Sequence, residues 1–154
     1  MPSTLTPSTT TPSTLTPTAA EFLALVAALD EPLPDLVRPL RWARGLAGEE
    51  VVEGRLESLT QIADLLPFSV DGWLTVGTLD RPPGPGYFYA QAMCLGREYA
   101  VQVTQAHPDG RIPLSDLAHG DQSLLSRAEA IAVMVAHCQE PGSVGGYAQS
   151  VEWY

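Results

Sequence analysis

The chain has 154 residues, 45% of them hydrophobic, and 18 acidic residues stand against 8 basic ones, which gives a net charge of -10 at pH 7. This surplus of negative charge repels phosphate backbones and anionic lipids, so nucleic acid and membrane surfaces are not expected as partners. No apolar run reaches the roughly 18 residues of a membrane-spanning helix, and the N-terminus lacks the pattern of a secretory signal, so we expect a cytoplasmic protein.

The first 17 residues form a tail rich in Ser, Thr and Pro. The hexapeptide PSTLTP occurs at 2–7 and again at 12–17. A segment of this composition buries too little apolar area to offset the entropy of ordering it, so residues 1–17 are expected to be disordered. We expect residues 18–154 to form a single domain.

Two helices are predicted at the start of this domain. Thr18-Ala19-Ala20-Glu21 has the pattern of a capping box, and apolar residues then recur at helical spacing as far as Leu29. A second helix is predicted from Leu36 to Leu46. Pro39 must lie in its first turn, because proline cannot donate a hydrogen bond in a helix interior.

A short strand and a short helix are predicted next. The strand covers 51–55, and Ser58-Leu59-Thr60-Gln61 has the pattern of a second capping box. Pro67 is expected to end the helix that this box opens.

The middle of the chain has the alternation of β-structure. Strands are predicted over 72–79, 87–95 and 99–105, separated by turn-forming segments. Because the connections are short, we expect neighbouring strands to pair as an antiparallel meander.

A helix and a last strand are predicted at the C-terminal end. Ser126-Arg127-Ala128-Glu129 is a third capping box, and residues 130–136 are apolar on all sides, as in a helix buried against a sheet. Residues 147–154 are expected to form a closing edge strand. The predicted fold class is therefore α+β, with an antiparallel meander packed against helices.

The sequence offers no evident catalytic set. His107, His119 and His137 lack the spacing of a helical metal pair, and Cys94 and Cys138 have the surroundings of buried small hydrophobes. We therefore expect no metal, no cofactor and no enzymatic activity. A nonstandard site among His137, Cys138 and Tyr147 remains an alternative.

Five residues are candidates for contact with a partner. Acidic side chains follow closely in the middle of the chain, and a large aromatic residue lies beside the C-terminus, where chains usually fray. The candidates are Glu49, Glu50, Glu53, Asp71 and Trp153. The alternatives are a solvated acidic face and a tryptophan that fastens the last strand to the sheet.

The C-terminal two-thirds of the chain resembles the Imm1 family of bacterial immunity proteins. The resemblance lies in Ile112-Pro113-Leu114, in the following helix of small apolar residues, in Val151-Glu152-Trp153 and in the strand-then-helix stretch 54–62. It covers about residues 50–154. The resemblance implies an α+β domain that protects a cell by occluding a toxin without catalysis.

Two binding functions follow from these observations. The first is an immunity-type inhibitor whose acidic surface binds a basic protein partner, for which opposite charge would accelerate association. The alternative is a general adaptor or chaperone-like domain that self-associates through a sheet edge. The sequence leaves the oligomeric state open.

Overall fold

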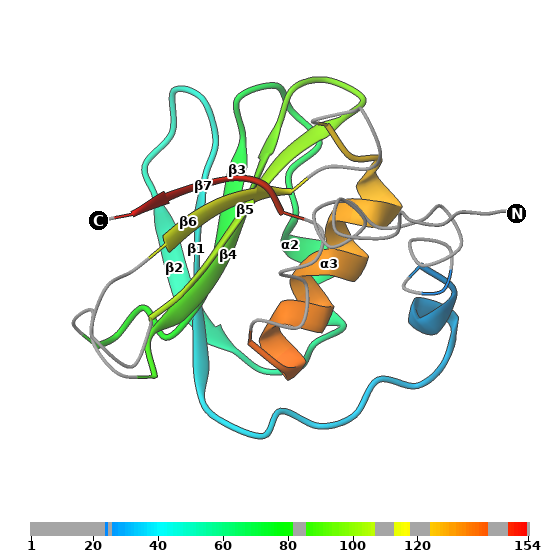
Figure 1. Ribbon diagram of the computed structural model, residues 1–154. Helices are drawn as coiled ribbons and strands as arrows, with labels where there is room; N and C mark the ends of the chain where they lie inside the picture. Colours follow the sequence, from blue (N-terminus) through cyan, green and yellow to red (C-terminus); the bar gives the residue numbers. More distant parts are fainter. Residues whose placement is uncertain are drawn as a thin grey trace, which may run out of the picture.

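The computed structural model describes residue 24 and residues 26–81, 86–106, 113–117, 124–141 and 148–153, with only the backbone of 113–117 and 148–153. Its centre is an antiparallel sheet of seven strands in the order β2-β1-β3-β4-β5-β6-β7 (Figure 1). The strands are β1 (Leu40–Gly45), β2 (Val52–Leu56), β3 (Trp73–Gly77), β4 (Phe88–Cys94), β5 (Tyr99–Gln105), β6 (Pro113–Leu117) and β7 (Ala148–Trp153). The predicted α+β class, the meander and the closing edge strand are confirmed.

The predicted helix from Leu36 to Leu46 is wrong, because β1 occupies most of that segment. β1 pairs with β2 on one side and with β3 on the other. The four apolar residues that indicated a helix lie at positions 36, 40, 42 and 46. Even separations also place residues on one face of a strand, and pairing on both sides decides between the two readings.

The second helix of the structure is α2 (Gln61–Leu65), and its predicted capping box does not form. Its N-cap residue, Thr60, makes no capping hydrogen bond through its side chain. The Ser58 hydroxyl instead lies 2.8 Å from that of Thr60, and the Gln61 side chain accepts from the backbone N–H of Glu57 at 2.8 Å. The helix therefore begins two residues later than the box predicts.

The capping box at Ser126 is confirmed at the start of α3 (Arg127–Gln139). The Ser126 hydroxyl accepts from the N–H of Glu129 at 3.1 Å, and the Glu129 carboxylate accepts from the N–H of Ser126 at 2.8 Å. Most of the helix is buried, as its apolar sequence predicts. Cys94 and Cys138 are free and buried, also as expected.

Both described α-helices cover the same face of the sheet (Figure 1). α3 contacts β3, β4 and β5, and it also packs against α2. Leu74, Val76 and Phe88 are buried from the sheet side of this layer. The core therefore lies between the sheet and the two helices.

An irregular strap leads from the first described turn to β1. It follows the 3-10 helix Ala28–Asp30, and we define it as residues 31–39. Leu33 and Leu36 pack against the edge of the core from this strap. The first helix is predicted to end before Asp30, and the described 3-10 turn runs one residue further, through Asp30. The predicted capping box at 18–21 and the tail at 1–17 lie outside the described residues.

Candidate protein-binding surface

Three loops meet at one end of the sheet, the upper end in Figure 1. They join β1 to β2 (46–51), α2 to β3 (66–72) and β4 to β5 (95–98). The N–H of Cys94 donates to the carbonyl of Gly72 at 2.8 Å, and the N–H of Asp71 donates to the carbonyl of Cys94 at 2.8 Å. Leu46 lies against Gly72, where a Cβ atom would come within 3.2 Å of its side chain. The three loops therefore form one continuous surface, which we call the end surface.

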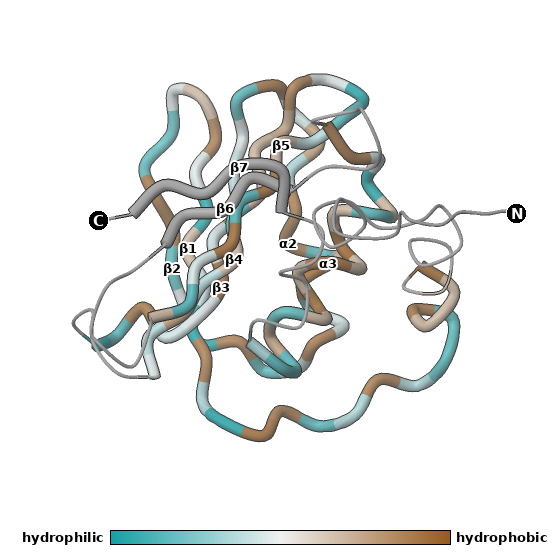
Figure 2. Tube along the Cα trace, viewed as in Figure 1, coloured by the Kyte–Doolittle hydropathy of each residue, from teal (hydrophilic) through white to brown (hydrophobic). Residues whose placement is uncertain are grey.

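Exposed hydrophobic side chains gather on the end surface and at the strand ends beside it. Among the described residues seven large hydrophobic side chains are exposed, and six of them lie here. Phe68 is the most exposed of all, at 76%. Figure 2 shows hydrophobic stretches in these loops. The six residues are Val51, Val52, Phe68, Val70, Met93 and Leu95.

Arg127 fixes the loop that carries Phe68. Its guanidinium donates to three backbone carbonyls at the end of α2, those of Ala63 at 2.9 Å, Leu66 at 3.0 Å and Pro67 at 3.3 Å. The ends of helices leave such carbonyls without partners, and here one cation from α3 satisfies them. The guanidinium also lies 3.6 Å from the centre of the Phe68 ring, a cation–π contact.

Tyr99 holds the same loop from the sheet side. Its hydroxyl donates to the Pro67 carbonyl at 2.7 Å and accepts from Arg127 at 2.7 Å. Burial raises the pKa of Tyr99, and the nearby Arg127 cation partly opposes that shift. The phenol therefore stays neutral and can keep its proton for the carbonyl. The loop presents Phe68 from a position that α2, α3 and β5 all hold.

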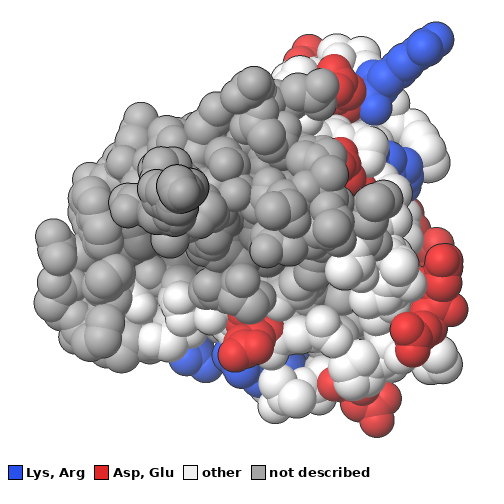
Figure 3. All heavy atoms as spheres, turned by 45° about the vertical axis from the view of Figure 1, so that its right-hand side comes forward, with Lys and Arg blue, Asp and Glu red and all other residues white. Residues whose placement is uncertain are grey.

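Acidic residues surround the exposed hydrophobic side chains. Glu49 and Glu50 are exposed in the loop between β1 and β2, and Glu53 is exposed nearby in β2. Asp71 is exposed beside Val70, with a φ of 69°, in the left-handed region. The face drawn in Figure 3 shows acidic side chains in several separate groups, with basic side chains beside some of them.

The structure brings together four of the five candidates from the sequence and separates the fifth. Trp153 lies in β7, opposite Pro113 in β6, at the far edge of the sheet from β2. Six strand spacings of about 4.8 Å place the two edges roughly 29 Å apart. The strand that contains Trp153 is therefore paired, and its backbone lies away from the end surface.

Sequence reasoning missed Phe68 and Arg127. Phe68 directly follows the proline that ends α2, in a segment without periodicity, and Arg127 looks like an ordinary residue inside a capping box. An apolar residue in a turn is a weak signal, because most exposed hydrophobic residues have no special role. Only the contact between the two residues shows that the aromatic ring is presented on a fixed support.

His137 and Cys138 are buried groups of the core. The Nε2 atom of His137 lies 2.9 Å from the carbonyl oxygen of Thr104, and its ring meets Phe88 edge-on at 5.6 Å. Burial lowers the pKa of His137 and raises the pKa of Cys138 to about 12. The imidazole and the thiol are therefore neutral near pH 7, and a neutral thiol is a poor nucleophile. Tyr147 lies outside the described residues.

Within the described ranges, no three His, Cys, Asp or Glu side chains are placed to hold a metal ion, and no helix has the length and apolar character needed to cross a membrane. Comparisons with models of protein families, with curated proteins and with solved structures found no match.

Proposed function

We propose that this chain is a non-catalytic binding protein that occludes a basic protein partner with its end surface, in the manner of an immunity protein that blocks a toxin domain. One observation carries the proposal: six of the seven exposed large hydrophobic side chains of the described residues gather there, with acidic residues around them. An apolar centre with a polar rim is the usual anatomy of a protein interface.

The support beneath Phe68 favours binding over an incidental exposure. A few aromatic residues commonly carry most of the binding energy of an interface, and a side chain that is already fixed loses little entropy on binding. The hydrogen bonds of Arg127 to the end of α2 fix the loop before any partner arrives. Phe68 is thus the expected anchor, in a pocket of the partner.

The acidic rim determines the kind of partner. The three loops of the end surface carry four exposed acidic residues, Glu49, Glu50, Asp71 and Glu98, against one exposed basic residue, Arg97. A partner whose binding face carries Lys or Arg would be attracted over several ångströms and would associate faster at low salt. Toxin domains that act on nucleic acid meet this requirement, and the resemblance to the Imm1 family supports the same class.

The proposal is tested by capturing the partner from the native host with three forms of the protein. We expect the wild type and Val37→Ser to retain the same basic protein, and Phe68→Ala to bind it at least about tenfold more weakly. Val37 is the matched control, because it is the one exposed large hydrophobic residue of the described chain away from the end surface.

A second measurement tests the role of charge. In Glu49→Gln/Glu50→Gln, the association rate should fall at low salt and approach the wild-type rate at high salt, while the dissociation rate changes little. Equal capture by wild type and Phe68→Ala would refute the end surface as the binding site. A captured partner without a basic face would refute the electrostatic part.

A further inference from the structure

The outer edge of β2 carries backbone groups that point away from the sheet. Among the described strands, β2 is the first in the sheet order and has β1 as its one neighbour. In an antiparallel sheet, successive residues direct their N–H and C=O groups alternately to the two sides. The N–H of Thr78 donates to the carbonyl of Phe88 in β4, so even-numbered residues of β3 direct their backbone groups toward β4 and odd-numbered ones toward β1. Followed through the registers of β1 with β3 and with β2, this alternation directs the N–H and C=O groups of Glu53 and Arg55 away from the sheet.

One of these outward groups already has a partner. The indole of Trp42 lies across β2 at Gly54, and its Nε1–H donates to the Arg55 carbonyl at 3.2 Å. A carbonyl oxygen has two lone pairs, so the Arg55 carbonyl can accept a second hydrogen bond. Within the described part of the chain, the outward N–H and C=O of Glu53 and the N–H of Arg55 have no partner and can pair with another strand.

The side chains of this edge have a charge pattern that is complementary to itself. Glu53 and Arg55 lie on either side of Gly54, both on the sheet face that α2 and α3 leave open. Across from Arg55 in β1 stands Arg41, a like charge in the directly opposite position. Like charges in that relation destabilise a sheet, and an acid on the outer side of Arg55 would relieve the repulsion.

We propose that two copies of the chain pair antiparallel through β2, about a twofold axis at Gly54. This register places Glu53 opposite Arg55 of the second copy, and the reverse, so that both pairs are of opposite charge. Because these residues direct their backbone groups outward, each pair also exchanges two backbone hydrogen bonds. The two sheets become one continuous sheet.

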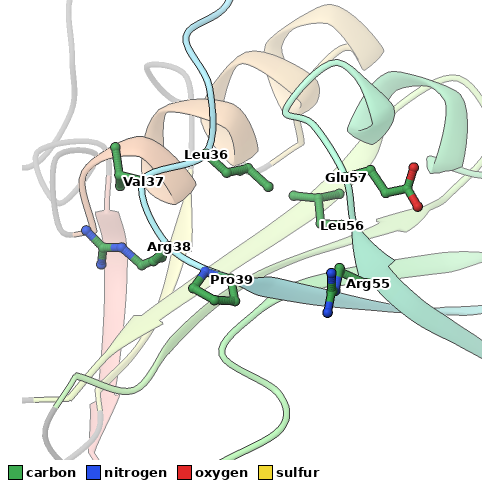
Figure 4. Close-up of a pocket in the computed structure, with 7 residues that line it drawn as sticks. All are labelled: Leu36, Val37, Arg38, Pro39, Arg55, Leu56 and Glu57. Atoms are coloured by element: carbon green, nitrogen blue, oxygen red, sulfur yellow. The ribbon is translucent and has the colours of Figure 1, made fainter.

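The same register accounts for an exposed valine and an open hollow on the helix side of the edge. Val52, which is 52% exposed, comes opposite Leu56 of the second copy, and Val51 comes opposite Glu57. A hollow of about 610 Å³ opens beside Leu56 and Glu57 (Figure 4). Each copy thus brings Val52 alongside the hollow of the other, where burial of its apolar surface adds to the pairing, whereas Val51 belongs to the opposite face of the sheet.

Self-complementarity favours a second copy over an unrelated strand. An arbitrary strand would need an acid and a base in the one order and spacing that Glu53 and Arg55 present. A second copy has both by symmetry, which is the property of an isologous twofold interface. The pairing also covers an edge that would otherwise be open to uncontrolled association.

Charge reversal and its repair test the register. Sedimentation should show a concentration-dependent dimer of the full chain, and Glu53→Arg or Arg55→Glu alone should raise its dissociation constant at least about tenfold, because each places like charges opposite one another. Glu53→Arg/Arg55→Glu restores opposite charge in both pairs and should dimerise like the wild type. An equimolar mixture of the two single variants should form a heterodimer for the same reason.

Two further variants separate this pairing from misfolding and from the proposed partner site. Glu53→Pro removes an outward N–H at a position where an edge strand tolerates proline, and it should give a monomer with unchanged circular dichroism. Phe68→Ala should leave the dimer intact, so failure of one proposal is distinguishable from failure of the other. A wild type that stays monomeric up to about 1 mM, or a double variant that fails to restore the dimer, would overturn the inference.

Discussion

Two irregular segments lie against opposite ends of α3, and different forces hold them. The loop 66–72 meets the start of α3, where Arg127 and Tyr99 donate to the carbonyls of Leu66 and Pro67 at 2.7 to 3.3 Å. The strap 31–39 passes the end of α3 and is held by partly buried leucines such as Leu33 and Leu36. Short hydrogen bonds fix a backbone in one geometry, whereas apolar contacts have no direction and tolerate gaps.

The hollows of the molecule reflect this difference. Three of them, of about 240, 330 and 180 Å³, are lined by strap residues together with α3 or the segment after β2. Each forfeits packing contacts that a filled core would make. The loop is therefore held in one geometry and presents a surface, whereas the strap covers the core loosely and leaves hollows beside it.

The largest expected effect is the loss of the hydrogen bonds that Arg127 donates to the end of α2. Arg127→Met keeps the length of the side chain but leaves several carbonyls at the end of α2 without a donor, so the free energy of unfolding should fall by about 3 kcal/mol. Urea denaturation measures it, with Arg97→Met in the exposed turn 95–98 as the control that should change little. A loss below about 1 kcal/mol would mean that water replaces the guanidinium at no cost.

The two cysteines report on the two segments separately. Cys94 lies under the loop, with its Sγ atom 3.4 Å from the carbonyl oxygen of Phe68, and Cys138 lines the hollow beneath the strap. If the strap opens more easily, a thiol reagent should label Cys138 about tenfold faster than Cys94, equivalent to about 1.4 kcal/mol in opening free energy. Mass spectrometry of the labelled peptides measures the two labelling rates, each divided by the rate of the same cysteine in unfolded protein. Faster labelling of Cys94 would reverse the comparison.

Truncation of a side chain in the strap should lower the free energy of unfolding by less than removal of the Arg127 guanidinium. Leu33→Ala removes a partly buried side chain that already borders two hollows, so we expect a loss of about 1 kcal/mol in unfolding free energy. The same variant should accelerate labelling of Cys138 and leave Cys94 unchanged. Val37→Ala, at an exposed position of the strap, is the control. Equal acceleration at both cysteines would show that the strap and the loop open as one unit.

The smallest effect concerns pH and the strap end of α3. Burial lowers the pKa of His137, so this residue contributes stability above its unfolded pKa of about 6.5 that is lost as the pH falls. Between roughly pH 7.5 and pH 6 the loss should reach at most about 0.8 kcal/mol, and His137→Gln should remove it. Urea denaturation at the two values measures the difference, and identical losses in the variant would assign the acid sensitivity to other groups.

The amino-acid sequence by itself determined the strands over 72–79, 87–95 and 99–105 and the helix after Ser126, because their alternation, turns and capping box all indicate the same structure. It also identified the acidic residues of the end surface. These features are local, and local chemistry is what a sequence displays directly.

Only the tertiary structure decided what depends on pairing between distant segments. The segment 40–45 carries a pattern that fits a helix or a strand, and its two neighbours in the sheet made it β1. The contact of Arg127 with Phe68 joins residues that are far apart in the chain. The assignment of Glu53 and Trp153 to opposite edges follows from strand order, which depends on long-range backbone pairing that no local pattern encodes.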